Sequence, residues 1–596
     1  MSYQEAYSFG VDFGTTKSYV EVIGMQSLHN STGQSRLTVM RAYNDGFDRY
    51  TQLPEMKYSF GSPSIKKSGT LITELKGNLA KNVSTEVGNG LEMPSPVAVA
   101  AFLRSLVTRS LDQYPGEKYV TITIPANIGM DTRAAMLYAA KLAELENVTL
   151  LEEPLAAFLA FYEQYLRSNV RYRREDLYGK KVLVVDFGGG TCDVASILIG
   201  DEHEPARVLG KNSDNQLGGN DVSFALQEAL IEEKFAVRYD DPERKTEQSY
   251  DQLSQLNIAK ETLSNQFWQD IELDNFLQMP DVAQREEMLE RWNHGHIFQL
   301  RHLVTLHGTR HGAEQVHLTG EIFDTAVMRA IEGKLIKLLS PFVKDVPDYE
   351  FVVLVGGSCQ LPQVARIIHR WLSTHGAKRA HSKIWRTRSS ELPNYIAQGA
   401  ALYNKYKMQQ NGSVLPVVPL MDRGLYLITD SQDPDLNEGR FQNALDRGAL
   451  QILIPLGSFL PYPDHSDRLS PQQKQLSFDE IVSPTGGIRR VLRSAFAPSN
   501  NTRTKQLIYL LELPEDGSDS KLIERMIDLP AVGDRTMNLN LWVDENGLLE
   551  AFASPEADQG KDYSEQRIFV QYPFNPGNTT DIAAHIERFG LRSIRS

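Results

Sequence analysis

The chain has 596 residues, a net charge of −14 at pH 7 and two cysteines. This length predicts more than one domain with ample core. The negative charge argues against a general nucleic-acid or anionic-membrane surface, and no apolar run approaches the ~20 residues that span a bilayer. Two cysteines exclude a disulfide framework, and the first residues lack the pattern of a secretory signal. We therefore expect a cytoplasmic protein without nucleic-acid or membrane partners.

The first predicted element is a strand, a tight turn and a second strand. Apolar residues at 8–11 and 19–23 flank the turn. The turn region contains an acid, a glycine, two threonines and a lysine: Asp12, Gly14, Thr15, Thr16 and Lys17. Glycine lets backbone N–H groups approach an anion closely, threonine hydroxyls add donors, and an Asp beside them can hold a metal or its waters. Alone, such a turn is more simply a chain reversal.

Strands and helices then alternate. The pattern predicts a strand at 119–125, a helix at 131–145, a strand ending near Glu153, and a helix at 155–166 that follows Pro154. A helix at 394–408 closes this part of the chain. Such alternation predicts an α/β fold with two lobes.

A near-copy of the first turn occurs at residues 185–193, again between apolar runs. It contains Asp186, three glycines and a threonine: Gly188, Gly189, Gly190 and Thr191. A third glycine turn, Gly356, Gly357 and Ser358, joins an apolar run at 351–355 to a helical pattern starting near Gln363. Three such turns together predict two similar lobes that clasp one polyphosphate.

Two local features allow more than one interpretation. Residues 276–318 contain six of the 13 histidines. Their spacing is irregular for zinc, so a solvated insertion is the simpler interpretation. Cys192 and Cys359 lie beside glycine turns, either as small buried residues or as thiols whose modification blocks nucleotide binding. We expect no disulfide between them, because facing lobes would hold them apart.

From about 414 to 572 the pattern changes to short strands and turns. Runs at 450–455, 506–513 and 539–543 are strand-like, and an Asn-Gly turn follows the last. We expect an antiparallel β-sandwich, then a tail with one helix at 580–589.

Together, these motifs resemble the DnaK-type seventy-kilodalton heat-shock chaperones of the actin-like ATPase superfamily, over roughly residues 7–565. The motifs are the three glycine turns, Glu153-Pro154, and the stretches 216–221 and 259–264. The resemblance implies a two-lobed actin-like ATPase domain (1–408, with an insertion near 276–316), a linker (409–420), a β-sandwich (421–572) and a short tail (573–596). The family's helical lid is nearly absent from this chain.

The resemblance also implies site residues. Mg²⁺ would be held through water by Asp12 and Asp186, with Lys76, Glu153 and Thr191 completing the catalytic set. The implied contacts to ATP or ADP come from the turns and from two further stretches: Gly14, Thr15, Thr16, Lys17, Gly188, Gly189, Gly190, Gly218, Gly219, Lys260, Ser264, Gly356, Gly357 and Ser358. Lys76 is otherwise a surface lysine, and Glu153 otherwise a helix N-terminal acid.

Several positions depart from the family pattern. Val414-Leu415-Pro416-Val417 replaces its linker sequence, and Asn257, Gln360 and Pro393 replace a Glu, an Arg and an Asp. In the β-sandwich, Leu425, Leu427 and Ile428 would contact a peptide or else form ordinary core.

Two hypotheses for function remain. The first is an ATP-dependent chaperone, a slow ATPase that couples nucleotide state to binding of unfolded or extended polypeptide. Such a chaperone could work with a J-domain co-chaperone and a nucleotide-exchange factor. The second is a nucleotide-dependent scaffold or adaptor with weak ATPase activity and one dedicated partner. The β-sandwich disfavours a small-molecule kinase.

Overall fold

A computed structural model describes residues 6–24, 30–31, 34–61, 64, 68–126, 128–168, 173–214, 216–232, 242–271, 273–279, 282–300, 316–386, 394–408, 417–421, 423–456, 458, 460–463, 477–482, 488–496, 505–514, 520–528, 537–555, 562 and 572–594. Most of the proposed linker, residues 409–416, lies outside this part of the chain. So does the segment 301–315 of the proposed insertion.

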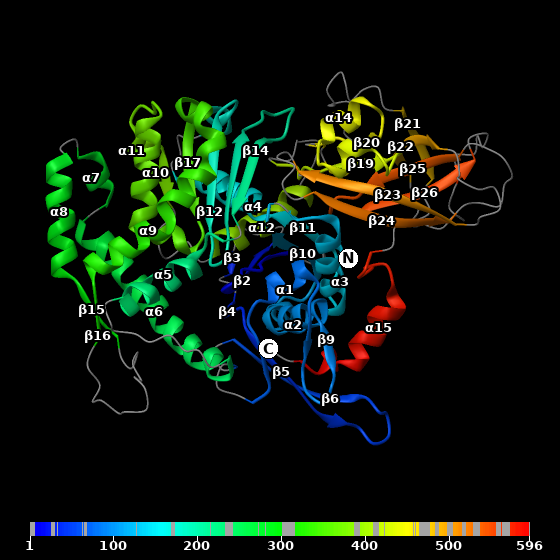
Figure 1. The fold of residues 1–596 in the computed structure, drawn as a ribbon, viewed down its shortest axis with the longest axis horizontal. Coiled ribbons are helices and arrows are strands. Elements are labelled where there is room, and N and C mark those ends of the chain that lie inside the picture. The colour runs from blue at the N-terminus through cyan, green and yellow to red at the C-terminus, as the bar shows by residue number, and fades with distance from the viewer. Residues whose placement is uncertain are drawn as a thin grey trace.

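Two lobes with matching sheets form the α/β part (Figure 1). The first sheet has the order β11-β10-β1-β2-β3, with β4 also on β2, and the second has the order β18-β17-β12-β13-β14. In each, an antiparallel hairpin (β1–β2 or β12–β13) is joined by a parallel strand (β10 or β17). The predicted strand–turn–strand units and α/β alternation are therefore confirmed. The strands are β1 (Ala6–Asp12), β2 (Lys17–Gly24), β3 (Asn30–Ser31), β4 (Ser35–Leu37), β10 (Glu117–Ile124), β11 (Val148–Glu152), β12 (Lys181–Phe187), β13 (Cys192–Leu198), β14 (Arg207–Asp214), β17 (Tyr349–Val355) and β18 (Ile384–Arg386).

Helices cover both sheets and carry the peripheral parts. The first lobe has α1 (Leu75–Lys81), α2 (Ser95–Gln113), α3 (Met130–Leu142) and the small strands β5 (Met40–Phe47), β6 (Pro54–Phe60), β7 (Thr70–Ile72), β8 (Ser84–Glu86) and β9 (Glu92–Pro94). The second lobe has α5 (Gly219–Glu232), α6 (Pro242–Ile271), α7 (Leu273–Gln278), α8 (Val282–Gly295), β15 (Ile297–Leu300), β16 (Val316–Thr319), α9 (Gly320–Leu339), η3 (Ser340–Asp348), η4 (Gly357–Gln360), α10 (Pro362–Thr374) and α11 (Ala380–Lys383).

The histidine-rich segment is anchored rather than fully solvated. Phe276 and Trp292 are buried, and Trp292 packs edge-on against Phe267 of α6. Among the described residues, no group of three or more His, Cys, Asp or Glu side chains could hold a metal ion directly.

Two helices, α4 (Glu153–Ser168) and α12 (Tyr395–Met408), lie between the sheets. Helix α4 packs under the second sheet, whereas α12 packs on the first. The helices touch backbone to backbone, since a Cβ added to Gly399 would lie 1.7 Å from the carbonyl oxygen of Ala156. A residue without a side chain is therefore required at this crossing.

Two four-stranded antiparallel sheets follow, ordered β20-β19-β23-β24 and β21-β22-β25-β26. The strands are β19 (Arg423–Ile428), β20 (Leu450–Ile454), β21 (Ser477–Val482), β22 (Ile488–Phe496), β23 (Lys505–Pro514), β24 (Lys521–Asp528), β25 (Met537–Val543) and β26 (Leu549–Pro555). The predicted Asn-Gly turn is present, with Gly547 at a φ of 78°. Two short helices, α13 (Pro434–Asn437) and α14 (Phe441–Asp446), connect β19 to β20, where only strands and turns were expected.

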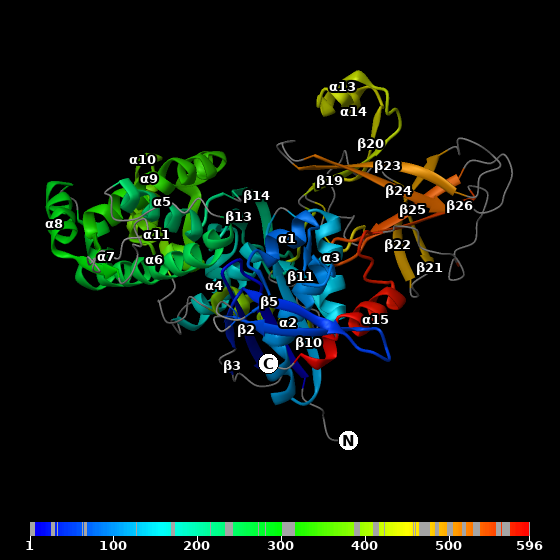
Figure 2. The ribbon, with the colours of Figure 1, turned by 60° about the horizontal axis from the view of Figure 1, so that its bottom comes forward.

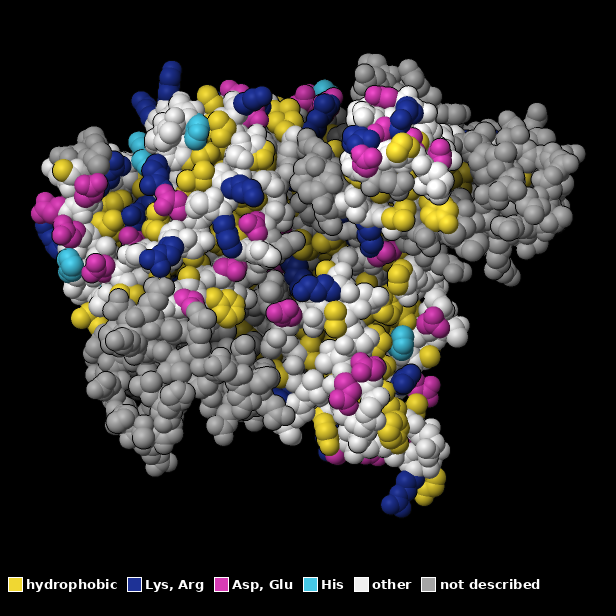
Figure 3. All heavy atoms as spheres, in the orientation of Figure 1, with side chains coloured by type: hydrophobic (Ala, Val, Ile, Leu, Met, Phe, Trp, Pro, Cys, Tyr) yellow, Lys and Arg dark blue, Asp and Glu magenta, His cyan; other side chains and the backbone are white. Residues whose placement is uncertain are grey.

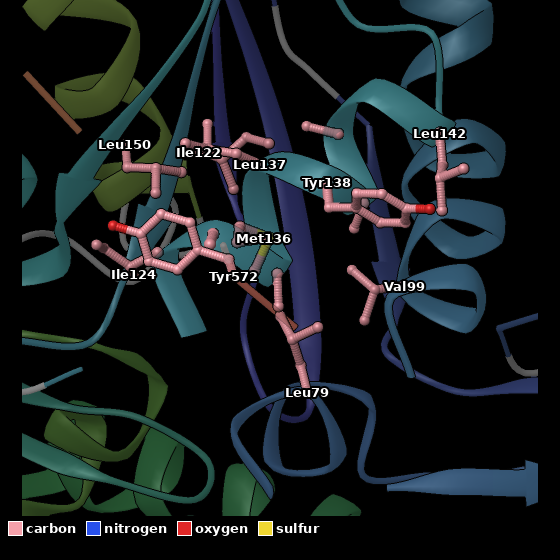
Figure 4. Packing of buried hydrophobic residues seen from close by; sticks show 14 of the residues in the cluster. Leu79, Val99, Ile122, Ile124, Met136, Leu137, Tyr138, Leu142, Leu150 and Tyr572 are labelled. Atoms are coloured by element: carbon pink, nitrogen blue, oxygen red, sulfur yellow. The ribbon is translucent and has the colours of Figure 1, made fainter. Parts of the chain in front are cut away.

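The core of these sheets runs into that of the first lobe. Leu425 and Leu539 belong to the same buried cluster as Ile122 and Leu137. Figure 4 shows Tyr572, from the C-terminal segment, beside Leu150 and Ile124 of the first lobe. The predicted tail helix is confirmed as α15 (Thr579–Arg588), which lies along α3 (Figure 2). Lys141 of α3 donates to the Pro576 carbonyl, and Tyr138 shares a 2.8 Å hydrogen bond with His585.

We predict that Gly399→Ala destabilises the protein by ~1–3 kcal/mol, because its Cβ would overlap the Ala156 carbonyl. The matched control is Gly333→Ala in α9, where an added Cβ meets nothing within 4 Å. It should be neutral or stabilising by up to ~1 kcal/mol through helix propensity. Chemical denaturation of both variants measures the difference. Equal stabilities would contradict the close crossing.

Candidate active site

The first two glycine turns face each other across the lobes. A Cβ added to Gly189 would lie 2.0 Å from Thr16 Oγ1, and one added to Gly190 would lie 2.8 Å from Thr15 Cγ2. Any larger residue would push the turns apart. The facing turns, each beside an Asp at a strand end, form the floor of the candidate site. Gly14 lies on the approach to the first turn, where a Cβ would meet the Lys17 carbonyl oxygen at 2.2 Å.

The remaining glycine elements surround the second turn. The Gly188 carbonyl accepts from Ser358 Oγ at 2.7 Å and from the Gly219 N–H at 3.0 Å. Gly356 has a φ of 83°, and a Cβ there would lie 2.6 Å from Asp186 Oδ1. A Cβ added to Gly218 would come as close to Gly190, whereas one added to Gly357 would meet nothing within 4 Å. Elements far apart in sequence thus converge on one turn.

Lys76 and Glu153 form an ion pair beside the turns. Lys76, at the start of α1, donates to Glu153 Oε1, and the two side chains are only 11% and 6% exposed. The alternative interpretation of Lys76 as a surface lysine is therefore wrong. Glu153 does begin α4, but its carboxylate pairs with Lys76.

Buried carboxylates surround this ion pair. Burial, and then the charge of Glu153, raise the pKa of Asp12 to about 7, against the opposing effect of Lys76. The same two causes raise the pKa of Asp186 well above its ordinary value. Asp193 is fully buried, and burial and Glu153 raise its pKa to about 6. One lysine thus lies among four carboxyl groups. This excess of negative charge favours binding of a further cation.

Asp193 is the residue that sequence reasoning missed. It lies directly opposite Asp186 in the β12–β13 ladder. Directly opposite residues of an antiparallel pair share a face of the sheet. Pairing the residues of the two strands across the turn in the sequence would have placed Asp193 opposite Asp186.

Polar atoms in the site fit a bound nucleotide. Within the described residues, the buried hydroxyls of Thr16 and Ser264 have no hydrogen-bond partner. Lys260 donates to the Gly219 carbonyl at 2.8 Å, and burial lowers its pKa to about 8. Lys17 reaches Glu261 of the other lobe at 3.5 Å. Since the carboxylates form no direct metal-ligand group, Mg²⁺ would be held here through water and phosphate oxygens.

Both cysteines are buried within the second lobe. Cys192 lies in β13 and Cys359 in η4, so both belong to the second lobe rather than to facing lobes, contrary to the expectation from sequence. Both are free and buried, and burial raises the pKa of each thiol. A thiolate is the reactive form, so labelling is disfavoured.

The strand residues proposed for peptide contact do not share one surface. Leu425 and Leu427 are buried in the large core cluster, as in the ordinary-core interpretation. Ile428 lies on the opposite side of β19, partly buried against α14.

A family model described as Hsp70 protein matches residues 59–299. The match includes Lys76, Glu153, the second glycine turn and α6. This match supports an Hsp70-type member of the actin-like ATPase superfamily. Hsp70 proteins are ATPases that bind ATP or ADP with Mg²⁺, so the match supports a chaperone-like nucleotide-binding role. None of the described helices has the length and apolar character to cross a bilayer.

We predict that the nucleotide-free protein loses stability as the pH rises toward 7. A carboxyl group whose pKa is higher in the folded protein than in the unfolded chain binds its proton more tightly when folded. Its contribution to stability is complete below the ordinary pKa of 3.8 and is lost as the pH approaches about 7. Asp12→Asn should flatten this decline in urea unfolding between pH 5 and 8. Parallel wild-type and variant curves would contradict the raised pKa.

Proposed function

We propose that this chain binds and slowly hydrolyses Mg-ATP in the cleft between its lobes and couples the nucleotide state to binding of unfolded or extended polypeptide. The observation that carries this proposal is the buried Lys76–Glu153 pair beside Asp12, Asp186 and Asp193, where the two glycine turns meet. The Hsp70 match supports it and does not favour a dedicated scaffold.

Each side chain has a proposed role. Asp12 and Asp186 would hold the hydration shell of Mg²⁺, and Asp193, opposite Asp186, would add negative charge beside them. Lys76 stabilises charge on the transferred phosphoryl group, while Glu153 and Thr191 orient the attacking water. When bound, Mg²⁺ would neutralise phosphate charge. Backbone N–H groups of the first two turns cradle the phosphates, and Lys17 adds a positive charge at the cleft.

The adenosine side is proposed from the second lobe. Lys260 and Ser264 of α6, the Gly218–Gly219 turn, and Gly356, Gly357 and Ser358 would line it. The hydroxyl of Ser264 is buried without a partner in the described residues, which supports a ligand contact there.

A series of ion pairs and hydrogen bonds supports coupling of the two lobes to the C-terminal sheets. Glu152, next to Glu153, pairs with Arg133 of the first lobe at 3.2 Å and with Lys211 of the second lobe. Arg133 also donates to the carbonyl of Asn546, in the β25–β26 turn, at 3.4 Å. The Asn546 side chain accepts from the Leu150 N–H at 2.8 Å. Movement of either lobe would thus act on this turn.

We propose that the two four-stranded sheets form a β-sandwich domain over 421–572, after an ATPase domain (1–408) and a linker (409–420) and before a tail (573–596). The contact of this domain with α3 would change with the nucleotide state of the ATPase domain. A 2.8 Å ion pair between Lys521 and Asp131, and a 3.1 Å bond from the Met130 N–H to the buried Glu512, support the docking.

Asp186→Asn is expected to lower ATP turnover at least ~10-fold, a loss of about 1.4 kcal/mol of transition-state stabilisation. Phosphate release under single-turnover conditions measures it. The matched control is Asp112→Asn, an exposed carboxyl at the end of α2, which should turn over as wild type. Unchanged rates in both Asp12→Asn and Asp186→Asn would rule out the proposed metal-holding role.

Reversing one charge at the docking contact should loosen it. Lys521→Glu places like charges together, and a partly exposed pair of this kind contributes ~0.2–1 kcal/mol. We expect hydrogen exchange of the Met130 and Leu150 amides to quicken by up to about fivefold. The double variant Lys521→Glu with Asp131→Lys should restore protection. Equal exchange in all three proteins would show that this pair does not hold the sheets to the lobe.

A further inference from the structure

One stretch of the second lobe differs in charge from the rest of the chain. Residues 351–390 include no Asp or Glu, although the whole chain carries a net charge of −14. The same stretch contains seven Lys or Arg residues and three histidines. Its helix α10 begins just after the third glycine turn and leads away from it to α11. The stretch therefore brings a local excess of positive charge to a protein that is otherwise acidic.

Three cations of this stretch join elements of the second lobe to one another. Arg366 of α10 pairs with Asp324 of α9 at 2.6 Å, and Arg370 of α10 pairs with Glu332 of α9. Lys383 of α11 donates to backbone carbonyls of η3 and β17. Packing of the lobe thus accounts for these three side chains.

Other cations gather where α8, α10 and α11 meet. Burial, and then the charges of Arg285 on α8 and His381 on α11, lower the pKa of His369 on α10. Lys378 and Arg379 come shortly before His381 in the chain, and both are exposed. Among the described residues, no acid pairs with Arg285, Lys378 or Arg379. We name these five residues, Arg285, His369, Lys378, Arg379 and His381, the basic patch.

The turn between α10 and α11 holds part of the basic patch in a fixed position. Figure 3, in the orientation of Figure 1, shows Lys, Arg and His side chains gathered over these two helices. The Ala377 N–H donates to the Leu372 carbonyl at 3.0 Å, and Ala380 is buried in the core of the lobe. The Ser382 N–H and hydroxyl each donate to the Arg379 carbonyl at 2.9 Å. A backbone that is already ordered lowers the entropic cost of binding a partner.

Arg379 occupies a backbone position that suits glycine better. Its φ is 51°, in the left-handed region, where a residue with a Cβ is strained. The dipole of α10 does not require a cation there, because that effect is confined to the last turn, and α10 ends at Thr374. A residue that breaks a local rule without helping the fold is expected at functional positions.

We infer that the basic patch is a docking surface for an acidic polypeptide segment of a partner protein. The inference goes beyond the proposed function and does not depend on it. Helix α10 has 13 residues and is therefore ~20 Å long, with the third glycine turn at one end and the basic patch toward the other. Docking on the basic patch thus uses a surface separate from the nucleotide site.

The size and setting of the basic patch select this partner. It extends from α8 across α10 to α11, and a helix with its side chains is ~10 Å wide, so one small anion cannot cover it. Three or four residues of an extended chain, at ~3.3 Å each, span that width. Nucleic acid is disfavoured, because it binds to strongly basic domains, whereas this chain carries a net charge of −14. Exposed ion pairs are individually weak, so the association should be fast and sensitive to salt.

The first test uses the full chain and a dye-labelled octapeptide whose central residues are all acidic, with fluorescence anisotropy as the measure of binding. Arg379→Glu should weaken binding at least ~3-fold, and Lys378→Glu with Arg379→Glu at least ~10-fold, because each change puts like charges together. Both side chains are exposed, so folding should survive, as circular dichroism can check. The matched control is Arg49→Glu, an exposed arginine in a turn of the first lobe, which should bind as wild type.

The second test locates the bound peptide on the wild-type protein. A carbodiimide joins a lysine amine to a contacting carboxylate as an amide, with the oxygen of the carboxylate leaving on the reagent. Mass spectrometry should find the octapeptide linked to Lys378 and absent from Lys81, an exposed lysine at the end of α1. The same peptide with amides in place of its carboxyl groups should neither bind nor link.

The outcomes decide between an acidic polypeptide and other partners. Equal peptide affinity in wild type and the double variant, or no binding to either, would overturn the inference. A labelled oligonucleotide that binds more tightly than the peptide and is lost in the double variant would make nucleic acid the partner. Self-association of the wild type in sedimentation, abolished by the double variant, would make a second copy of this chain the partner. ATP turnover should be unchanged in Arg379→Glu, so the proposed function is tested separately.

Discussion

Burial of several carboxyl groups around a single lysine is the constraint on which the rest of this structure depends. Asp12, Asp186 and Asp193 lie in the interior with Glu153, and Lys76 is the cation that contacts Glu153. Breaking a buried ion pair by removing one partner typically costs ~3–5 kcal/mol. Such a cluster is tolerated only where strands hold the side chains rigidly. The duplicated hairpins provide that rigidity, since each places an Asp at the end of a central strand.

Two consecutive glutamates at the end of β11 link this cluster to distant parts of the protein. Glu152 and Glu153 are neighbours, yet their side chains serve different networks. Glu153 pairs with Lys76 beside the glycine turns, whereas Glu152 pairs with Arg133 and Lys211. The ion pair beside the glycine turns and the ion pairs that join the two lobes therefore involve adjacent residues. The contact from Arg133 to Asn546 extends this path to the C-terminal sheets.

The C-terminal sheets use their two faces differently. One face joins the core of the first lobe, where Leu425 and Leu427 are buried and Glu512 accepts from the N-terminus of α3. The other face carries an apolar surface that is only partly covered by a short helical connection. The same strand, β19, thus connects the lobe-facing core to the covered surface.

Sequence patterns alone determined much of this protein. Glycine turns beside aspartates identified both hairpins, because few other residues allow such tight reversals. Apolar runs located β10, β12, β17 and α12 to within a few residues. Local chemistry also identified Asp12 and Asp186 as candidates, since charge and turn propensity are properties of short segments, whereas Lys76 and Glu153 were proposed from the family resemblance.

Tertiary structure decided the rest. Asp193 acquires its place only through cross-strand register, and the burial of Lys76 follows from the approach of α1 to α4. Short helices such as α13 and α14 lack a periodic pattern long enough to recognise, and they exist because a sheet face lies beneath them. The choice between Leu425 and Tyr426 as outward residues was likewise open, since alternation defines two faces of a strand without saying which one meets the core. Burial is a property of packing between distant segments, so no local pattern could supply it.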